Sequence, residues 1–79
     1  MGDAEKLIEM MRRFQYPSCR QTGNEEEAFC AEQFADFRSE CGRVKDEAAK
    51  GMCFEAARNW NNACNGWVND CDSKRLKGR

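Results

Sequence analysis

Six cysteines constrain this 79-residue chain more than any other feature, and the inner four form two C-x10-C runs. Eleven residues advance an α-helix by three full turns plus about 20°. Cys30 and Cys41 would therefore share one face of a helix, about 16 Å apart, and Cys53 and Cys64 would share one face of another. Two such helices, joined by residues 42–52, can fold back antiparallel and form the disulfides Cys30–Cys64 and Cys41–Cys53.

The outer cysteines, Cys19 and Cys71, both lie beyond the open end of this hairpin, where Cys30–Cys64 is the last rung. We predict a third bridge, Cys19–Cys71, with two free buried thiols as the alternative. So many cysteines in a short chain indicate an oxidising compartment.

The size of the chain makes such bonds necessary. Seventy-nine residues form one domain, near the size where a hydrophobic core alone is marginal. Only 41% of the residues are hydrophobic and 34% are charged. The chain-entropy treatment gives each of the two nested disulfides roughly 3–4 kcal/mol. The composition therefore favours a small helical scaffold stabilised by disulfides.

Hydrophobic periodicity predicts an amphipathic helix over residues 3–14, with Asp3 as its N-cap. A helix of this length is marginal in water, so it would dock on its own domain, on a neighbouring protein or, least favoured, on a membrane surface. Its apolar face consists of Ala4, Leu7, Ile8, Met11 and Phe14.

The first hairpin arm follows a break at Tyr16-Pro17. Thr22 or Asn24 would cap it, and it would end at Gly42. Its inward face would be Cys30, Phe34, Phe37 and Cys41.

The second arm would run from about Asp46 to Cys64, with Trp60 in the core and Cys53, Ala56 and Ala57 on the same face. Asn65-Gly66 predicts a break, followed by a third short helix over residues 67–76. Trp67 would then either cover the end of the hairpin or anchor a partner.

The predicted fold class is thus all-α: a disulfide-stapled antiparallel helical hairpin with an N-terminal helix and a short C-terminal helix. The N-terminal helix occupies residues 1–15 and the hairpin domain residues 16–79.

Residues that carry common chemistry are missing. The chain has no histidine and no glycine-rich phosphate loop, and its cysteines are too far apart for C-x2-C metal or redox motifs. We therefore expect no enzymatic activity, no metal and no cofactor, but a rigid binding surface.

The charges are also consistent with a non-catalytic helical scaffold. The net charge of −1 gives no reason to expect nucleic-acid binding. The acidic run 25–27 and the basic residues Lys74, Arg75, Lys77 and Arg79 are interpreted as a helix start and a helix end.

No apolar run approaches the length of a membrane span. The first residues show neither a signal-peptide core nor the acid-poor composition of a transit peptide. If Met1 is the native start, the mitochondrial intermembrane space fits an oxidised chain without a cleaved presequence. The alternative is a signal peptide removed upstream of this sequence.

Residues 16–78 resemble subunit VIb of mitochondrial cytochrome c oxidase, a family of twin-cysteine helical-hairpin (CHCH) proteins. That family shows an aromatic-Pro pair, then Gln-Thr and the first hairpin cysteine, aromatics inside the first arm, and a C-x10-C second arm. The corresponding residues here are Tyr16-Pro17, Gln21-Thr22, Cys30, Phe34, Phe37, Cys53 and Cys64.

The C-terminal match is the most specific part of the resemblance. The family has Trp-Val, two acids around an aromatic, then Arg and Gly; here these are Trp67-Val68, Asp70, Asp72, Arg75 and Gly78. The first cysteine interval is one residue longer than usual, and Cys71 replaces the aromatic between the acids. Cys19, Ala31 and the helix 3–14 also depart from the family pattern.

The resemblance implies a non-catalytic accessory subunit of respiratory complex IV, peripheral to the inner membrane on its intermembrane-space side. Its partners would be other oxidase subunits, at subunit or dimer contacts, and the oxidative import receptor of that space. The partner-binding residues would be Tyr16, Pro17, Trp67, Val68, Asp70, Asp72 and Arg75.

Other functions stay open at this point. A CHCH-type assembly factor of the oxidase shares the Trp, Asp and Arg after the fourth cysteine but lacks the segment 16–22, which favours the structural subunit. An accessory subunit of another respiratory complex is a further alternative. A secreted disulfide-rich toxin or pheromone is the remote one, for which Gly78-Arg79 would suggest amidation.

Overall fold

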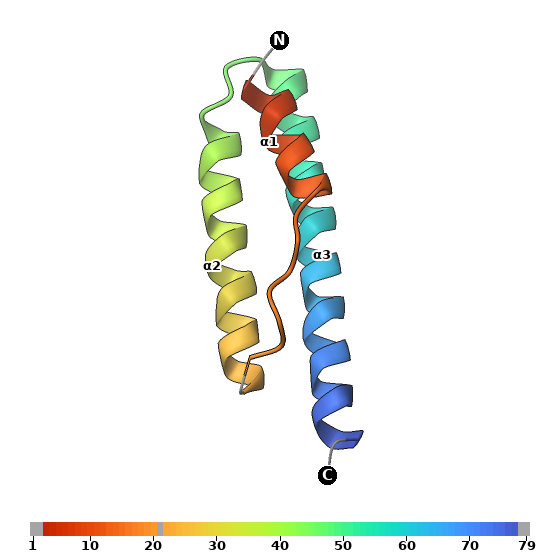
Figure 1. Cartoon of the computed structure of the whole chain (residues 1–79). Coiled ribbons are helices and arrows are strands. Elements are labelled where there is room, and N and C mark those ends of the chain that lie inside the picture. Colours follow the sequence, from red (N-terminus) through yellow and green to blue (C-terminus); the bar gives the residue numbers. More distant parts are fainter. Residues whose placement is uncertain (1–2, 21, 78–79) are drawn as a thin grey trace.

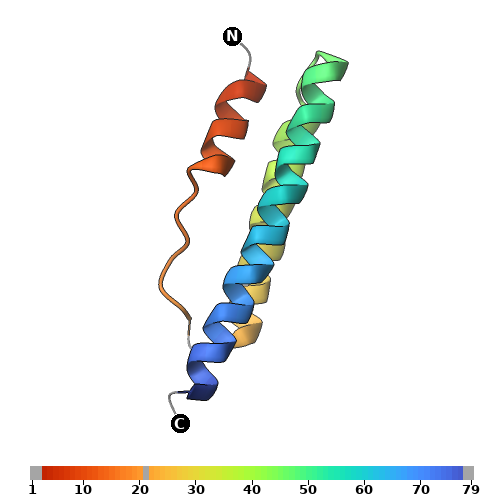
Figure 2. The same cartoon turned by 90° about the vertical axis from the view of Figure 1, so that its right-hand side faces the viewer.

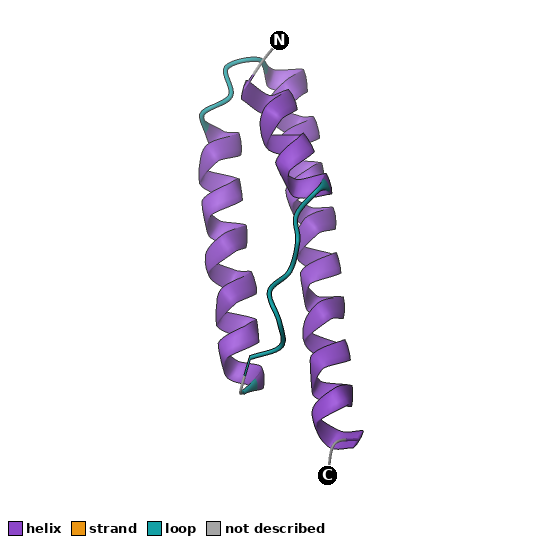
Figure 3. Cartoon of the chain, in the orientation of Figure 1, coloured by secondary structure: helices purple, strands orange, loops and turns teal. Residues whose placement is uncertain are grey.

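Three helices form the described part of the chain, which covers residues 3–20 and 22–77 of this computed structural model (Figure 1). They are α1 (Asp3–Arg12), α2 (Gly23–Gly42) and α3 (Glu47–Lys77). No strand occurs in these residues, so the predicted all-α class is confirmed for them (Figure 3). The predictions made on Met1, Gln21, Gly78 and Arg79 lie outside the described residues.

The first turn of α2 is held by a side-chain cap. The Thr22 hydroxyl accepts a hydrogen bond from the backbone N–H of Glu25 at 3.2 Å. Thr22 is therefore the N-cap, and Asn24, the other candidate, lies inside the helix. The helix ends at Gly42, as the sequence predicted.

The start of α3 was also predicted, but its length was not. The Asp46 carboxylate accepts a hydrogen bond from the backbone N–H of Ala49 at 2.8 Å and so caps the helix. From Glu47 the helix continues to Lys77. The predicted break at Asn65-Gly66, and with it the separate short helix over residues 67–76, is wrong.

Packing explains why α3 continues through two turn-forming residues. Its buried face repeats without interruption on both sides of them, through Cys53, Ala57, Trp60, Cys64, Val68 and Cys71. Gly66 is exposed, and a Cβ there would meet no atom within 4 Å. Its cost is therefore the intrinsic helix penalty of about 1 kcal/mol, which the buried face outweighs.

The helices are arranged as a hairpin with a third helix laid along it. α2 and α3 are antiparallel, and α1 runs in the direction of α3 (Figure 1). α1 contacts α3 far more extensively than α2. It thus docks on its own domain, one of the three possibilities that the sequence left open. Figure 2 shows α1 and the connector that follows it, residues 13–20, on one side of the α2–α3 pair.

Three disulfides join these elements. Cys30–Cys64 and Cys41–Cys53 link α2 to α3, with Cα–Cα distances of 5.9 and 5.5 Å. Both confirm the pairing predicted from the cysteine intervals. Cys19–Cys71 ties the connector to α3 with a Cα–Cα distance of 5.5 Å, so the third predicted bridge forms. All six cysteines are bonded.

The core is a narrow seam between the helices. Trp60 is 3% exposed, as predicted, and its ring meets that of Phe37 edge-on at 5.0 Å. Phe34 is only half-buried, and the Arg38 guanidinium lies over its ring at 5.5 Å. A long, thin molecule results, with extents of 50 × 18 × 15 Å.

Candidate interaction surface

An aromatic cluster joins the connector to both arms of the hairpin. Its members are Phe14, Tyr16, Phe29, Phe37, Trp60 and Trp67. The Phe14 ring lies 5.2 Å from Trp60 and 6.2 Å from Phe37, both edge-on. Tyr16 stacks on Trp67 at 5.7 Å, with an interplanar angle of 19°. Such aromatic pairs contribute about 0.5–1.5 kcal/mol each beyond their burial, so the cluster holds the connector in place.

Two roles were predicted for Trp67, covering the end of the hairpin or anchoring a partner, and these contacts favour the first. Tyr16 covers its face, and the Phe29 ring approaches it at 5.6 Å and 64°. Trp67 is half-buried within the domain rather than projecting from it. Burial also raises the pKa of the Tyr16 phenol.

A groove of about 540 Å³ runs between the N-terminal segment and α3. Its apolar walls include Ile8, Met11 and Phe14 on one side and Met52, Ala56, Trp60 and Ala63 on the other. Arg12, Glu55 and Asn59 supply polar groups. Met52, at 63% exposed, is one of two large hydrophobic side chains that stand out into solvent, and Met10 at 60% is the other in the described part of the chain.

A buried carboxylate forms the polar centre of the open end. Glu26 is 0% exposed and accepts two hydrogen bonds from the Arg75 guanidinium, at 2.6 and 3.0 Å. The backbone N–H of Arg20 donates a third at 2.9 Å. Arg75 also donates to the Arg20 carbonyl at 2.8 Å and pairs with Asp72. The connector, α2 and α3 meet in this one network.

The network determines the charge of Glu26. The side-chain hydrogen bonds from Arg75 lower the pKa of Glu26 below its ordinary value, and they outweigh the opposing effect of burial. The hydrogen bond from the Arg20 backbone lowers this pKa further. Glu26 is therefore an ionised group at pH 7, paired with a cation that is always charged.

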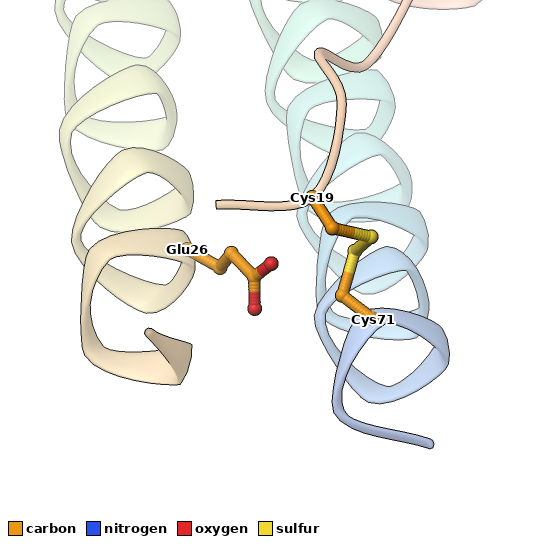
Figure 4. Close-up of side chains that lie close together, drawn as sticks. All are labelled: Cys19, Glu26 and Cys71. Carbon is orange, nitrogen blue, oxygen red and sulfur yellow. A yellow bond between two sulfur atoms is a disulfide. The ribbon is translucent and has the colours of Figure 1, made fainter. Parts of the chain in front are cut away.

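Glu26 points toward the Cys19–Cys71 bond (Figure 4). Both sulfurs and a carboxylate oxygen of Glu26 lie within 4.8 Å of one another, a spacing that would suit three ligands of one metal ion. Metal binding by cysteine requires the thiolate. Because both sulfurs are bonded to each other, these three groups are a packing contact in the oxidised chain.

The residues predicted to bind a partner lie in different environments in the structure. Val68 is only 5% exposed and packs in the core, so it offers little surface to a partner in this structure. Asp72 and Arg75 are engaged in the internal network. Tyr16, Pro17 and Trp67 are half-buried at the connector, and Asp70 is exposed.

The Glu26–Arg75 pair was missed because both residues were interpreted from local charge patterns, as part of a helix start and a helix end. Spacing contains the missing signal. Glu26 precedes Cys30 by four residues, which places it on the inward face of α2. Arg75 follows Cys64 by eleven residues, the same interval that separates Cys53 from Cys64.

Comparisons of the chain with models of protein families, with curated proteins and with solved structures return no match. In the residues that the structure describes, no helix has both the length and the apolar composition needed to cross a bilayer. The functional interpretation therefore depends on the residues and their geometry.

Proposed function

We propose that this chain is a non-catalytic accessory subunit of mitochondrial cytochrome c oxidase, bound on the intermembrane-space side. The observation that carries the proposal is the disulfide register of the hairpin. Cys30–Cys64 and Cys41–Cys53 join two antiparallel helices at equal intervals. This arrangement is compatible with a CHCH hairpin, the fold that the resemblance to subunit VIb implies.

The two segments that carry the resemblance also meet in space. Tyr16, in the aromatic-Pro segment, stacks on Trp67, the first residue of the C-terminal match. Arg75, also in that match, donates to the backbone carbonyl of Arg20 in the connector. Residues that are far apart in the sequence are expected to belong to one family pattern when they contact one another in the fold. These contacts therefore support the proposal.

Rigidity suits a docking subunit. Three disulfides and the aromatic cluster fix the helices before any partner binds. Less conformational entropy is then lost on association, so the same contacts give a tighter complex. The proposed activity of the chain is thus to strengthen contacts between other subunits, not to transfer electrons.

The proposal is tested by blue-native electrophoresis of mitochondria from the source organism, with immunodetection of this chain. We expect comigration with mature cytochrome c oxidase. Migration with another respiratory complex, or with none, would contradict the assignment. Presence only on an oxidase assembly intermediate would contradict it as well, in favour of the assembly factor.

A matched pair of variants tests the predicted surface. Asp70 is exposed, and its side chain makes no hydrogen bond or ion pair within residues 3–20 and 22–77, so Asp70→Lys should reduce the fraction of the protein in the complex. Asn69 is an exposed neighbour outside the predicted set. Asn69→Lys should leave that fraction unchanged, and equal losses from both variants would remove Asp70 from the partner surface.

A further inference from the structure

The three disulfides differ in the solvent exposure of the cysteine residues that form them. Cys19 is an exposed residue in the connector. Each of the other five cysteines is at most 1% exposed. Because exchange requires a thiolate to attack a disulfide sulfur directly, access decides which bond reacts first. Cys19 is the only cysteine of the six that is exposed.

We propose that Cys19 is a thiol-exchange site, where a small thiolate such as that of a glutathione-class peptide opens the Cys19–Cys71 bond while the hairpin disulfides stay closed. This inference is independent of the proposed function. The incoming thiolate bonds to Cys19 Sγ, and the electron pair of the broken S–S bond leaves with Cys71, which takes a proton from water. A second thiolate attacks the reagent sulfur of this mixed disulfide. It releases Cys19 and a disulfide of two reagent molecules, so two thiols supply the two electrons.

The exchange would release one defined part of the molecule. We call residues 3–20, which comprise α1 and the connector, the N-terminal strap. Its last residues continue through the backbone into α2, and Cys19–Cys71 is the disulfide that cross-links it to α3. Without this disulfide the strap is held against α3 by non-covalent contacts alone, chiefly those of Met11, Phe14 and Tyr16, together with the hydrogen bonds of the Arg20 backbone. A ten-residue helix such as α1 is not stable on its own, so the strap would open locally.

Opening would uncover a surface that is now closed. Phe14 and Tyr16 lie against Trp60, and Tyr16 lies against Trp67, so both tryptophans would gain solvent exposure. The hairpin itself would persist, because Cys30–Cys64 and Cys41–Cys53 do not involve the strap. The exchange site would therefore control access to an apolar face of α3.

The order of reduction tests the chemical half of the proposal. The oxidised chain is titrated with reduced glutathione, quenched at intervals with an alkylating reagent and mapped by mass spectrometry. We expect Cys19 and Cys71 to react about tenfold or more faster than the other four cysteines, with the trapped glutathione adduct on Cys19. Simultaneous reduction of all three bonds, earlier opening of another bond, or an adduct on Cys71 would overturn it.

Hydrogen exchange on the same partly reduced sample tests release of the strap. Amides of α1 should exchange about tenfold faster than in the oxidised chain, while those of α2 and α3 keep their protection. The double variant Cys19→Ala/Cys71→Ala should reproduce this pattern without reductant, and Cys41→Ala/Cys53→Ala is the matched control that leaves the strap attached. Unchanged protection of α1 after selective reduction would contradict release, and that measurement does not require either variant to fold.

Discussion

Glu26 is a carboxylate that the fold removes completely from water and surrounds with three donors from Arg75 and Arg20. A buried ion pair adds little net stability over an apolar pair, but removing one partner is costly. The Glu26–Arg75 pair therefore contributes chiefly to the specificity of the fold. It forms only when the connector and the end of α3 lie next to the first turn of α2.

Glu26→Gln tests this role because it keeps the size of the side chain and removes its charge. We expect a loss of about 1–3 kcal/mol in the free energy of unfolding at pH 7, measured with denaturant on the oxidised protein. The exposed neighbour Glu27 provides the control. Glu27→Gln should change stability by less than about 0.5 kcal/mol.

The same pair predicts a pH dependence. Because the folded-state pKa of Glu26 lies below its unfolded-state value of about 4.3, its stabilisation is complete above that value. It is lost as the pH falls through the lower folded-state pKa. The stability difference between the wild type and Glu26→Gln should therefore shrink in acid. A difference that stays constant from neutral pH into strong acid would show that the charge of Glu26 is not responsible.

At the scale of secondary-structure elements, the continuity of α3 is the main departure from the sequence-based prediction. Local turn propensity at Asn65-Gly66 predicted two helices, and the buried face on both sides produced one. The N-caps Thr22 and Asp46 were predictable because capping depends on neighbours in sequence. Continuity through Gly66 depends on residues of α2 and the connector, which local propensity does not include.

Gly66→Ala distinguishes a continuous α3 from a broken one. In an exposed helix interior, alanine should raise the free energy of unfolding by about 0.5–1 kcal/mol. Gly51 is also an exposed position in α3 with free space around it, so Gly51→Ala should give a similar gain. A loss of stability on Gly66→Ala, with a gain on Gly51→Ala, would instead support the predicted turn at residues 65–66.

At the scale of the whole molecule, the disulfides compensate for a core that is only one seam thick. A molecule of 50 × 18 × 15 Å buries few side chains for its length. The cysteine intervals were enough to predict the hairpin, because helix geometry converts an eleven-residue step into a fixed position along one face. The placement of α1 was not predictable, since an amphipathic helix identifies an apolar face but not what covers it.

Removing either hairpin disulfide should therefore be costly for the molecule as a whole. Chain entropy predicts a loss of about 3 kcal/mol for Cys41→Ala/Cys53→Ala and a similar loss for Cys30→Ala/Cys64→Ala. Thermal unfolding of the two double variants, followed by far-ultraviolet circular dichroism, measures both. Wild-type stability in either variant would show that this bond does not constrain the unfolded chain as the hairpin requires.

The most direct test of the central claim, that matched cysteine intervals hold two helices in one rigid hairpin, is disulfide mapping of the non-reduced native protein by mass spectrometry. We predict three cross-linked peptide pairs, Cys19–Cys71, Cys30–Cys64 and Cys41–Cys53. Links between Cys30 and Cys41, or between Cys53 and Cys64, would contradict the hairpin, because those sulfurs stand about 16 Å apart on a single helix. Fully reduced thiols or a bound zinc ion would contradict it equally.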